Sequence, residues 1–194
     1  MKKETILFVV IALAAGVLLG VVVTNSIKDS SSSPASVPAP VPAAAPVVNQ
    51  QQQTTILENI VAKEPENRNA WIQLGHSFFD SNQPMKAINA YAKALELNGN
   101  DPDILTDQGV MYRRVGWYDK AISNFEKASA IDPNHQQSLY NLGIVYRYDL
   151  QDFAKASVVW ERFVAIDPGS PGAKQVRVEL DFLKTYPEVP KPAQ

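Results

Sequence analysis

Three glycines, Gly75, Gly109 and Gly143, stand 34 residues apart, and no other feature of the sequence restricts the fold as strongly. Each glycine follows a large apolar residue by four positions and precedes an aromatic residue by three. A fixed period of this length is typical of repeat proteins, in which one unit cannot bury its apolar side alone and stacks on the next. We therefore expect a stack of similar units in this part of the chain.

Each unit has the pattern of two amphipathic helices, with apolar residues at i, i+3 or i+4, and i+7. The first helix carries the glycine, and the second carries an aromatic residue, Tyr91, Phe125 or Trp160, four positions after an alanine. This order of large, small and aromatic residues resembles the tetratricopeptide repeat over about residues 68–168. The resemblance implies an all-α fold, a right-handed solenoid of three helix-pair repeats with flanking helices.

Capping signals set the ends of the expected helices. Asp101 and Ser170 each precede a proline, so each side chain can accept a hydrogen bond from the first turn of a helix that begins there. Asp132 and Asp167, also followed by proline, mark the ends of second helices. We expect these segments: an N-terminal flanking helix over 54–67, repeats over 68–101, 102–135 and 136–170, a C-terminal capping helix over 171–186 and a tail over 187–194.

The third repeat departs from the other two at two places. One extra residue lies between Tyr146 and Ala156, which predicts a bulged turn at about Asp149 to Asp152. Phe163 stands where the other repeats have alanine, which predicts that the following helix is pushed outward. That last helix is expected to be a cap with a polar outer side, because a terminal unit faces water. The residues available for that side are Lys174, Arg177, Glu179 and Lys184.

The N-terminal part of the sequence predicts a membrane anchor. Residues 5–27 carry no charge, and 6–23 are all apolar, glycine or alanine. A helix of that length spans about 27 Å, close to the ~30 Å hydrocarbon core of a bilayer. Lys2 and Lys3 precede the run, so the positive-inside rule predicts a short cytoplasmic N-terminus over 1–4, a signal-anchor helix and a periplasmic or otherwise external remainder at the inner (cytoplasmic) membrane. A cleaved signal peptide is the alternative, although no Ala-x-Ala-like site follows.

Small residues recur within this apolar segment. Ala12, Gly16 and Gly20 share one helix face, and such a stripe allows close approach of two membrane helices. A homodimer through the transmembrane helix is therefore a hypothesis, and the simple abundance of glycine and alanine in membrane helices is its alternative.

A proline-rich segment follows the predicted anchor. Residues 28–53 contain five prolines, which forbid a continuous helix, so we expect a disordered linker. It reaches on the order of 70 Å when extended. A docking site for a proline-reading domain is the alternative to a plain spacer.

The resemblance also implies that the first helix of each repeat lines a groove for a protein or peptide partner. The register within the repeats assigns twelve residues to this partner groove: Ile72, His76, Phe79, Asp80, Thr106, Val110, Arg113, Arg114, Tyr140, Ile144, Arg147 and Tyr148.

Two chemistries of partner recognition can be compared at these positions. A carboxylate clamp of the chaperone-binding kind needs lysine or arginine, and the matching positions hold neither and include one acidic residue. The three arginines favour an amphipathic or acidic segment, since arginine pairs bidentately with carboxylates. Solvated helix ends are the alternative reading of these arginines. The five clamp positions are Ile72, His76, Asp107, Gln137 and Asn141.

The composition excludes most other functions. The chain has no cysteine, two histidines and a formal net charge of −2, which leaves no thiolate chemistry and no basic patch for nucleic acid. His76 and Asp80 lie one helical turn apart, but two ligands are too few for a metal ion. No serine follows an elbow-like motif, so no catalytic triad is expected. We therefore expect no enzyme activity, no metal and no cofactor.

These features together predict a membrane-anchored adaptor or scaffold that binds a protein or peptide on the extracytoplasmic side. The architecture is similar to that of bacterial tetratricopeptide proteins of cytochrome c maturation, which implies a role in the assembly or maturation of envelope proteins. A self-assembling structural scaffold in the envelope is the alternative.

Overall fold

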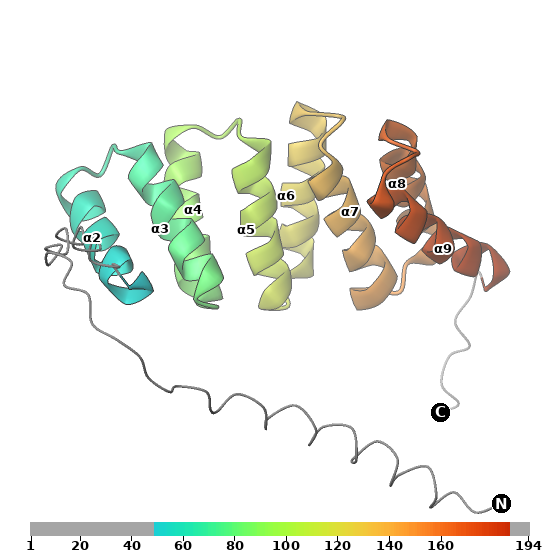
Figure 1. The fold of residues 1–194 in the computed structure, drawn as a ribbon, viewed down its shortest axis with the longest axis horizontal. Helices are drawn as coiled ribbons and strands as arrows, with labels where there is room; N and C mark the ends of the chain where they lie inside the picture. Colours follow the sequence, from blue (N-terminus) through green and yellow to red (C-terminus); the bar gives the residue numbers. More distant parts are fainter. Residues whose placement is uncertain (1–48, 187–194) are drawn as a thin grey trace, which may run out of the picture. The chain divides into compact units, whose positions relative to one another are not determined.

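A computed structural model describes residues 49–186, which form eight α-helices and one π-helical turn and contain no strand (Figure 1). This confirms the predicted all-α fold for the described residues. The elements are α2 (Gln50–Lys63), α3 (Arg68–Asp80), α4 (Pro84–Leu97), α5 (Pro102–Arg114), α6 (Tyr118–Ile131), α7 (Gln136–Ile144), η1 (Val145–Asp149), α8 (Phe153–Ile166) and α9 (Pro171–Thr185).

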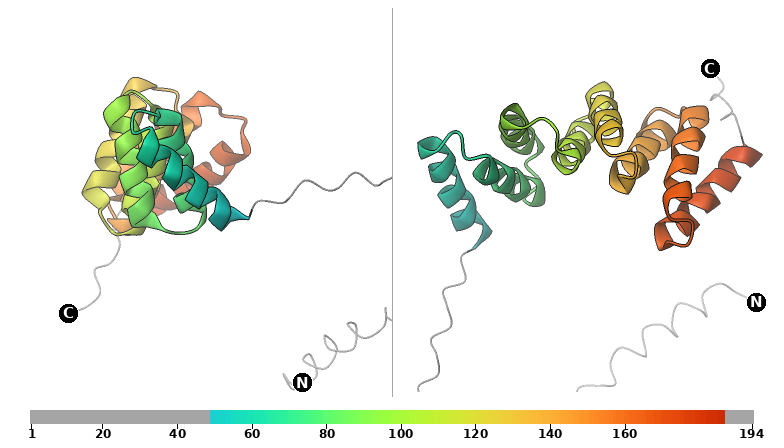
Figure 2. Two further views of the ribbon diagram at one scale, coloured as in Figure 1. Left: turned by 90° about the vertical axis from the view of Figure 1, so that its left-hand side faces the viewer. Right: turned by 90° about the horizontal axis from the view of Figure 1, so that it is seen from above.

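The helices follow one another in chain order as a solenoid (Figure 1). Helices α3 and α4, α5 and α6, and α7 and α8 form three pairs, and α3, α5 and α7 lie on one side of the stack with α4 and α6 on the other (Figure 2). Helix α2 is a lone second helix, and α9 is a lone first helix. The described residues belong to one compact unit, Pro46–Gln194, with two apolar cores of its own, as expected of a part that folds independently.

The repeated glycines explain how the two helices of a pair approach each other. A Cβ atom added at Gly109 would lie 2.6 Å from the Phe125 ring. A Cβ atom at Gly75 would collide with the Tyr91 ring in the same way, and one at Gly143 with the Trp160 ring. Each aromatic ring is therefore held directly against the backbone of the first helix.

The N-terminal flanking helix begins earlier than expected. The sequence placed its start at Thr54, whereas α2 starts at Gln50, within the segment we assigned to the linker. Asn49 and Gln52 form a capping box, in which each side chain accepts a hydrogen bond from the backbone N–H of the other residue. Glutamine is a good helix former, so a cap at Asn49 is enough to add this turn.

The extra residue of the third repeat does not lie in the turn between its helices, so the predicted bulge at 149–152 is wrong. The three turns that join first to second helices all have three residues, with a positive φ at the middle one, Asn82, Gly116 or Gln151. The extra residue is accommodated in η1, where Leu150 N–H bonds to the Val145 carbonyl five residues back (3.0 Å). The turn conformation is the same in all three repeats, and the helix takes up the insertion as a π-turn.

Phe163 is buried in the core beside the start of α9. Its ring lies 5.7 Å from the Tyr140 ring, and a Cβ atom at Gly172 would be 3.2 Å from the Phe163 Cζ atom. The missing side chain of Gly172 therefore makes room for the ring. The outward shift of α9 stays a prediction.

Several predicted features lie outside the described residues. These are the anchor over 5–27 with its stripe Ala12, Gly16 and Gly20, most of the linker over 28–53 and the tail over 187–194. Between residues 49 and 186, every helix is too short or too polar to cross a bilayer.

Candidate protein-binding face

Most of the residues that the register assigned to a partner lie at the surface of one face. We call this the first-helix face. It consists of the solvent-accessible residues of α3, α5, α7 with η1, and α9, helices that Figures 1 and 2 show along the solenoid. His76, Asp80, Arg114 and Tyr148 are exposed on it. The half-buried residues are Ile72, Phe79, Val110, Arg113, Tyr140, Ile144 and Arg147.

Thr106 is the exception among the twelve. Its relative exposure is 0%, so it cannot touch a partner in this conformation, contrary to the prediction. The equivalent positions hold Ile72 and Tyr140, whose longer side chains reach the surface. Threonine is too short to do so, and the neighbouring side chains close over it.

A polar pair spans α3 and α5 in the middle of this face. His76 Nε2 lies 3.2 Å from Asp107 Oδ2. The hydrogen bond to Asp107 raises the pKa of His76 above its ordinary value, although partial burial opposes the shift. His76 thus faces Asp107 and not Asp80, with which we considered a shared metal. Within residues 49–186, no three potential metal-ligating side chains gather in one place.

The three arginines that were expected to meet an acidic partner already have partners in the chain. Arg113 holds Asp149 with two hydrogen bonds, of 2.5 and 3.2 Å. Arg147 Nε lies 3.4 Å from Glu179 Oε2, and its guanidinium stacks over aromatic rings. Arg114 stacks on Phe79, with 4.6 Å between the guanidinium carbon and the ring centroid, and is the exposed one of the three. Arg114 also donates long hydrogen bonds to the Phe79 carbonyl (3.5 Å) and to Asn82 Oδ1 (3.4 Å), but it has no carboxylate partner among these contacts.

The predicted partner groove left out two residues of this face: Phe182, and Glu179, which the sequence assigned only to the polar side of the last helix. Helix α9 begins at Pro171, and counting from that start puts Phe182 at the same position as Phe79, Arg113 and Arg147. The Phe182 ring is 44% exposed and lies under the Arg147 guanidinium. The start signal at Ser170-Pro171 was enough to find both residues, but we read α9 as a cap only.

The first-helix face is held together by pairs between successive first helices. Besides the pairs above, Arg68 binds Asp101 (2.5 Å) and His135 binds Asp103 (2.9 Å). We call each of these side-chain pairs a rung of the first-helix face. Between the rungs lie half-buried apolar residues and the exposed rings of Tyr148 and Phe182. A surface with apolar strips between polar or charged pairs suits an amphipathic helix or an extended peptide.

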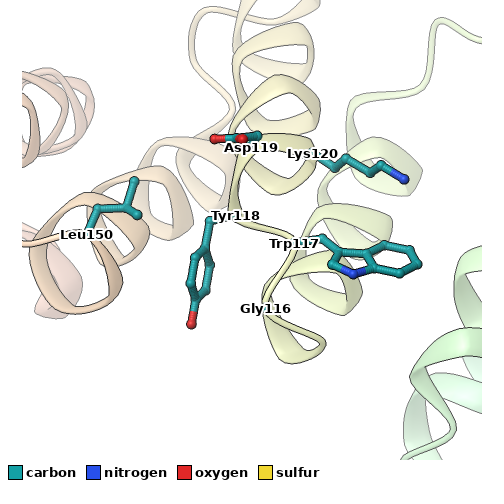
Figure 3. A pocket seen from close by; sticks show the side chains of 6 residues that line it. All are labelled: Gly116, Trp117, Tyr118, Asp119, Lys120 and Leu150. Carbon is teal, nitrogen blue, oxygen red and sulfur yellow. The ribbon is translucent and has the colours of Figure 1, made fainter.

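The edge of the solenoid carries a separate hollow of about 540 Å³. Figure 3 shows the Tyr118 ring facing Leu150, whereas Trp117 points to the other side of the turn with Lys120. The Lys120 ammonium lies 4.4 Å from the Trp117 ring centroid. Trp117 takes the N-cap position of α6, where its side chain accepts no hydrogen bond. This hollow lies at the turns that follow the first helices, apart from the residues assigned to the partner.

The helix pairs, the glycine–aromatic contacts and the face of first helices define a helical repeat protein. Models of the tetratricopeptide repeat match residues 69–101 and 90–123. The chain is a tetratricopeptide repeat protein, a class that mediates protein–protein interactions and whose scaffold is typically not catalytic.

Curated relatives are similar at low identity. The chain is 28% identical to the protein O-mannosyl-transferase TMTC3 of Homo sapiens, over 49% of this chain and 10% of that protein. It is 27% identical to the cytochrome c-type biogenesis protein CycH of Pseudomonas aeruginosa, over 65% and 31%. It is 28% identical to the photosystem I assembly protein Ycf3 of Prochlorococcus marinus, over 60% and 79%. The chain thus spans a small part of the transferase and about a third of CycH.

Solved structures share the fold. The crystal structure of MamA superposes with a TM-score of 0.65 at 21% identity, covering 70% of this chain and 79% of that one. YrrB, described as a tetratricopeptide protein with an unusual peptide-binding site, superposes with a TM-score of 0.61 at 26% identity, covering 66% of each chain.

Proposed function

We propose that this protein is an adaptor that binds a segment of another protein on its first-helix face and is held at a cell membrane by residues 5–27. The bound segment takes part in the assembly or maturation of envelope proteins on the extracytoplasmic side. The observation that carries the proposal is the continuity of the face: four successive first helices present apolar side chains between polar or charged pairs.

Two further observations support it. CycH and Ycf3 are named for the biogenesis of cytochrome c and the assembly of photosystem I, and both align with 60% or more of this chain. The uncharged run at 6–23 has the length and the basic flank of a signal-anchor. The proline-rich linker then holds the solenoid away from the lipid and gives it freedom to reach a client.

Photo-crosslinking in living cells tests the binding face. A photoreactive amino acid is placed at Phe79 or at Tyr148 of the full chain, both of which reach the surface of the first-helix face. Val158 of α8 is the matched control, because it is 61% exposed and lies on a second helix. We expect crosslinks to one client protein from the two face positions and none from Val158. Equal crosslinking from all three sites would remove the first-helix face as the binding surface.

Localisation is tested separately. External protease added to spheroplasts should degrade the solenoid, while a tag placed at residues 1–4 stays protected. Protection of the solenoid would place it in the cytoplasm and contradict the anchor topology.

A self-assembling scaffold is the second candidate, and the two ends of the solenoid favour it. Val178 of α9 is 69% exposed and Ile56 of α2 is 52% exposed, so both terminal helices present apolar groups to solvent. Light scattering on the unit 46–194 separates the candidates. A monomer at high concentration supports client binding, and a concentration-dependent oligomer that Val178→Glu dissociates supports the scaffold.

A further inference from the structure

The rung between α3 and α5 differs from the other rungs of the first-helix face because two buried hydroxyl groups lie at it. Within the described residues, the Tyr91 hydroxyl and Thr106 Oγ1 are the buried side-chain polar atoms without a hydrogen-bond partner. Both residues have a relative exposure of 0%. A buried hydroxyl without a partner is costly, so each such group needs an explanation.

Tyr91 contacts one member of the pair formed by His76 and Asp107, and Thr106 adjoins the other member in the chain. Thr106 directly precedes Asp107 in α5. The Tyr91 ring packs against Gly75 and meets the His76 ring edge-on, with 5.7 Å between ring centroids. Burial, and then the carboxylates of Asp107 and Asp80, raise the pKa of the Tyr91 phenol, while Arg114 lowers it. The phenol oxygen therefore points toward the groups of the first-helix face, into the rung.

The other two helix pairs show that a hydroxyl is not needed for packing at this place. Phe125 occupies the position of Tyr91 in the second repeat and has no polar group. Trp160 occupies it in the third repeat, and its indole N–H donates to the Tyr140 carbonyl (3.2 Å). Tyrosine with a buried and unbonded hydroxyl is thus particular to the first pair.

We propose that this rung is a subsite for a lysine side chain of the bound partner, with His76 as a displaceable lid. Asp107 is the counter-ion of the ammonium group, and the hydroxyl oxygens of Tyr91 and Thr106 accept its remaining hydrogen bonds. The proposal rests on the proposed function, because the lysine belongs to the segment bound on the first-helix face.

The chemistry of the rung selects an ammonium group. An ammonium has three donors and no acceptor, and the rung offers three acceptors: the Asp107 carboxylate and two neutral hydroxyls. A buried cation needs a counter-ion, which Asp107 supplies when His76 turns away. The His76 side chain is 49% exposed, so its ring can turn toward solvent and uncover the Tyr91 ring that it contacts. Asp80, on the same helix as His76, adds a second carboxylate at the rim and favours a cation further.

The first test uses the unit 46–194 and a small probe, Nα-acetyl-lysine-N-methylamide. Its neutral counterpart is Nα-acetyl-norleucine-N-methylamide, which has the same chain without the charge. We expect the lysine probe to shift the NMR signals of the His76 and Tyr91 rings in a saturable titration and the norleucine probe to leave them in place. Equal shifts with both probes, or none with either, would overturn the subsite.

Two variants separate binding from folding. Tyr91→Phe and Thr106→Val each remove an unbonded hydroxyl, so neither should lower the denaturation midpoint, while each should weaken lysine-probe binding by about fivefold. Tyr118→Phe is the matched control, because it removes a half-buried phenol hydroxyl at the edge of the solenoid. Undiminished binding by both variants would overturn the proposal, whereas a variant that loses stability together with binding would assign the hydroxyls to folding.

Because His76 can be protonated, its role as a lid makes binding of the lysine probe depend on pH. The groups that face His76 are Asp107 and Asp101 of α5, Asp80 of its own helix and the Tyr91 phenol. Protonated His76 holds Asp107 and repels a second cation, so lysine-probe binding should strengthen as the pH rises through the pKa of His76. In His76→Gln this pH dependence should vanish, and its persistence would refute the lid.

The outcome for the subsite is distinct from the outcome for the proposed function. Client crosslinks from Phe79 and Tyr148 that survive in Tyr91→Phe, together with a failed probe titration, would leave the binding face in place and remove the lysine subsite. Loss of the crosslinks in the unaltered chain would remove the proposed function itself.

Discussion

Arg113 of α5 binds Asp149 at the end of η1 with two hydrogen bonds, and this pair joins the second repeat to the π-turn of the third. The guanidinium meets both carboxylate oxygens, the geometry in which arginine pairs are strongest. Without the extra residue in η1, Asp149 would be rotated by one helix position relative to Arg113. The insertion therefore shapes the first-helix face as well as the local helix.

A double-mutant cycle should measure this pair. Arg113→Met and Asp149→Asn are each expected to destabilise the unit, and their coupling in urea denaturation should be about 1 kcal/mol, because both side chains are partly buried. The exposed pair Lys93 and Glu96 is the reference, and its coupling should be close to zero. Equal coupling in the two cycles would show that the bidentate geometry has no special strength.

The glycines that face aromatic rings should tolerate no side chain. Gly109→Ala puts a methyl group into the Phe125 ring, and we expect a loss of about 1–3 kcal/mol in the free energy of unfolding. Gly169→Ala is the matched control, since the nearest atom to its Cβ lies at an ordinary 3.6 Å. A second change, Phe125→Leu, should recover part of the loss at Gly109. A neutral Gly109→Ala would mean that the helix pair can separate freely.

Asp101 has two roles that substitutions can separate. Its Oδ1 accepts from Ile104 N–H at the start of α5 (3.1 Å), and its Oδ2 pairs with Arg68 (2.5 Å). Asp101→Ala loses both roles, and we expect a cost of about 2 kcal/mol. Asp101→Asn keeps a capping oxygen and loses the charge, so it should cost less. Chemical denaturation of both variants measures the two losses in the free energy of unfolding. Equal losses would mean that the cap contributes little to stability.

The stability of the unit should depend on pH through His76. The hydrogen bond to Asp107 raises the pKa of His76 in the folded state, although burial lowers it in part. The stabilising effect is therefore complete below the unfolded value of about 6.5 and is lost as the pH rises through the folded pKa. We expect a small fall in the denaturation midpoint over that interval, since the side chain is half exposed. His76→Gln should flatten this part of the profile, and a rise in stability over the same interval would contradict the pair.

The local pattern of the sequence was sufficient for the fold because helical periodicity, the 34-residue spacing and proline-linked caps all depend on nearby residues. Helix starts at Pro102 and Pro171 agree with the structure for this reason. The π-turn at Val145 was not predictable, because an insertion can be absorbed either by a turn or by a helix, and the pattern of a single repeat is compatible with both.

Side-chain partners across repeats were harder to predict than the face itself. The register placed Arg113 and Arg147 on the correct face, but their partners Asp149 and Glu179 lie more than 30 residues away. Such pairs depend on how far one first helix is shifted along the next. The pattern of a single repeat contains no information on that shift.

The described solenoid starts with half a repeat and ends with the other half. Helix α2 has the place of a second helix, and α9 has the place of a first helix. Each end of the described solenoid is therefore formed by a single helix and not by a complete helix pair. Every internal junction, in contrast, joins a second helix to a first one in the same way. A duplicated copy of residues 102–135, inserted after residue 135, would create one new junction, between α6 and the copy of α5, with the same order of second and first helix as the existing junctions. The length of the first-helix face is thus adjustable in steps of one repeat, with both ends of the solenoid left as they are.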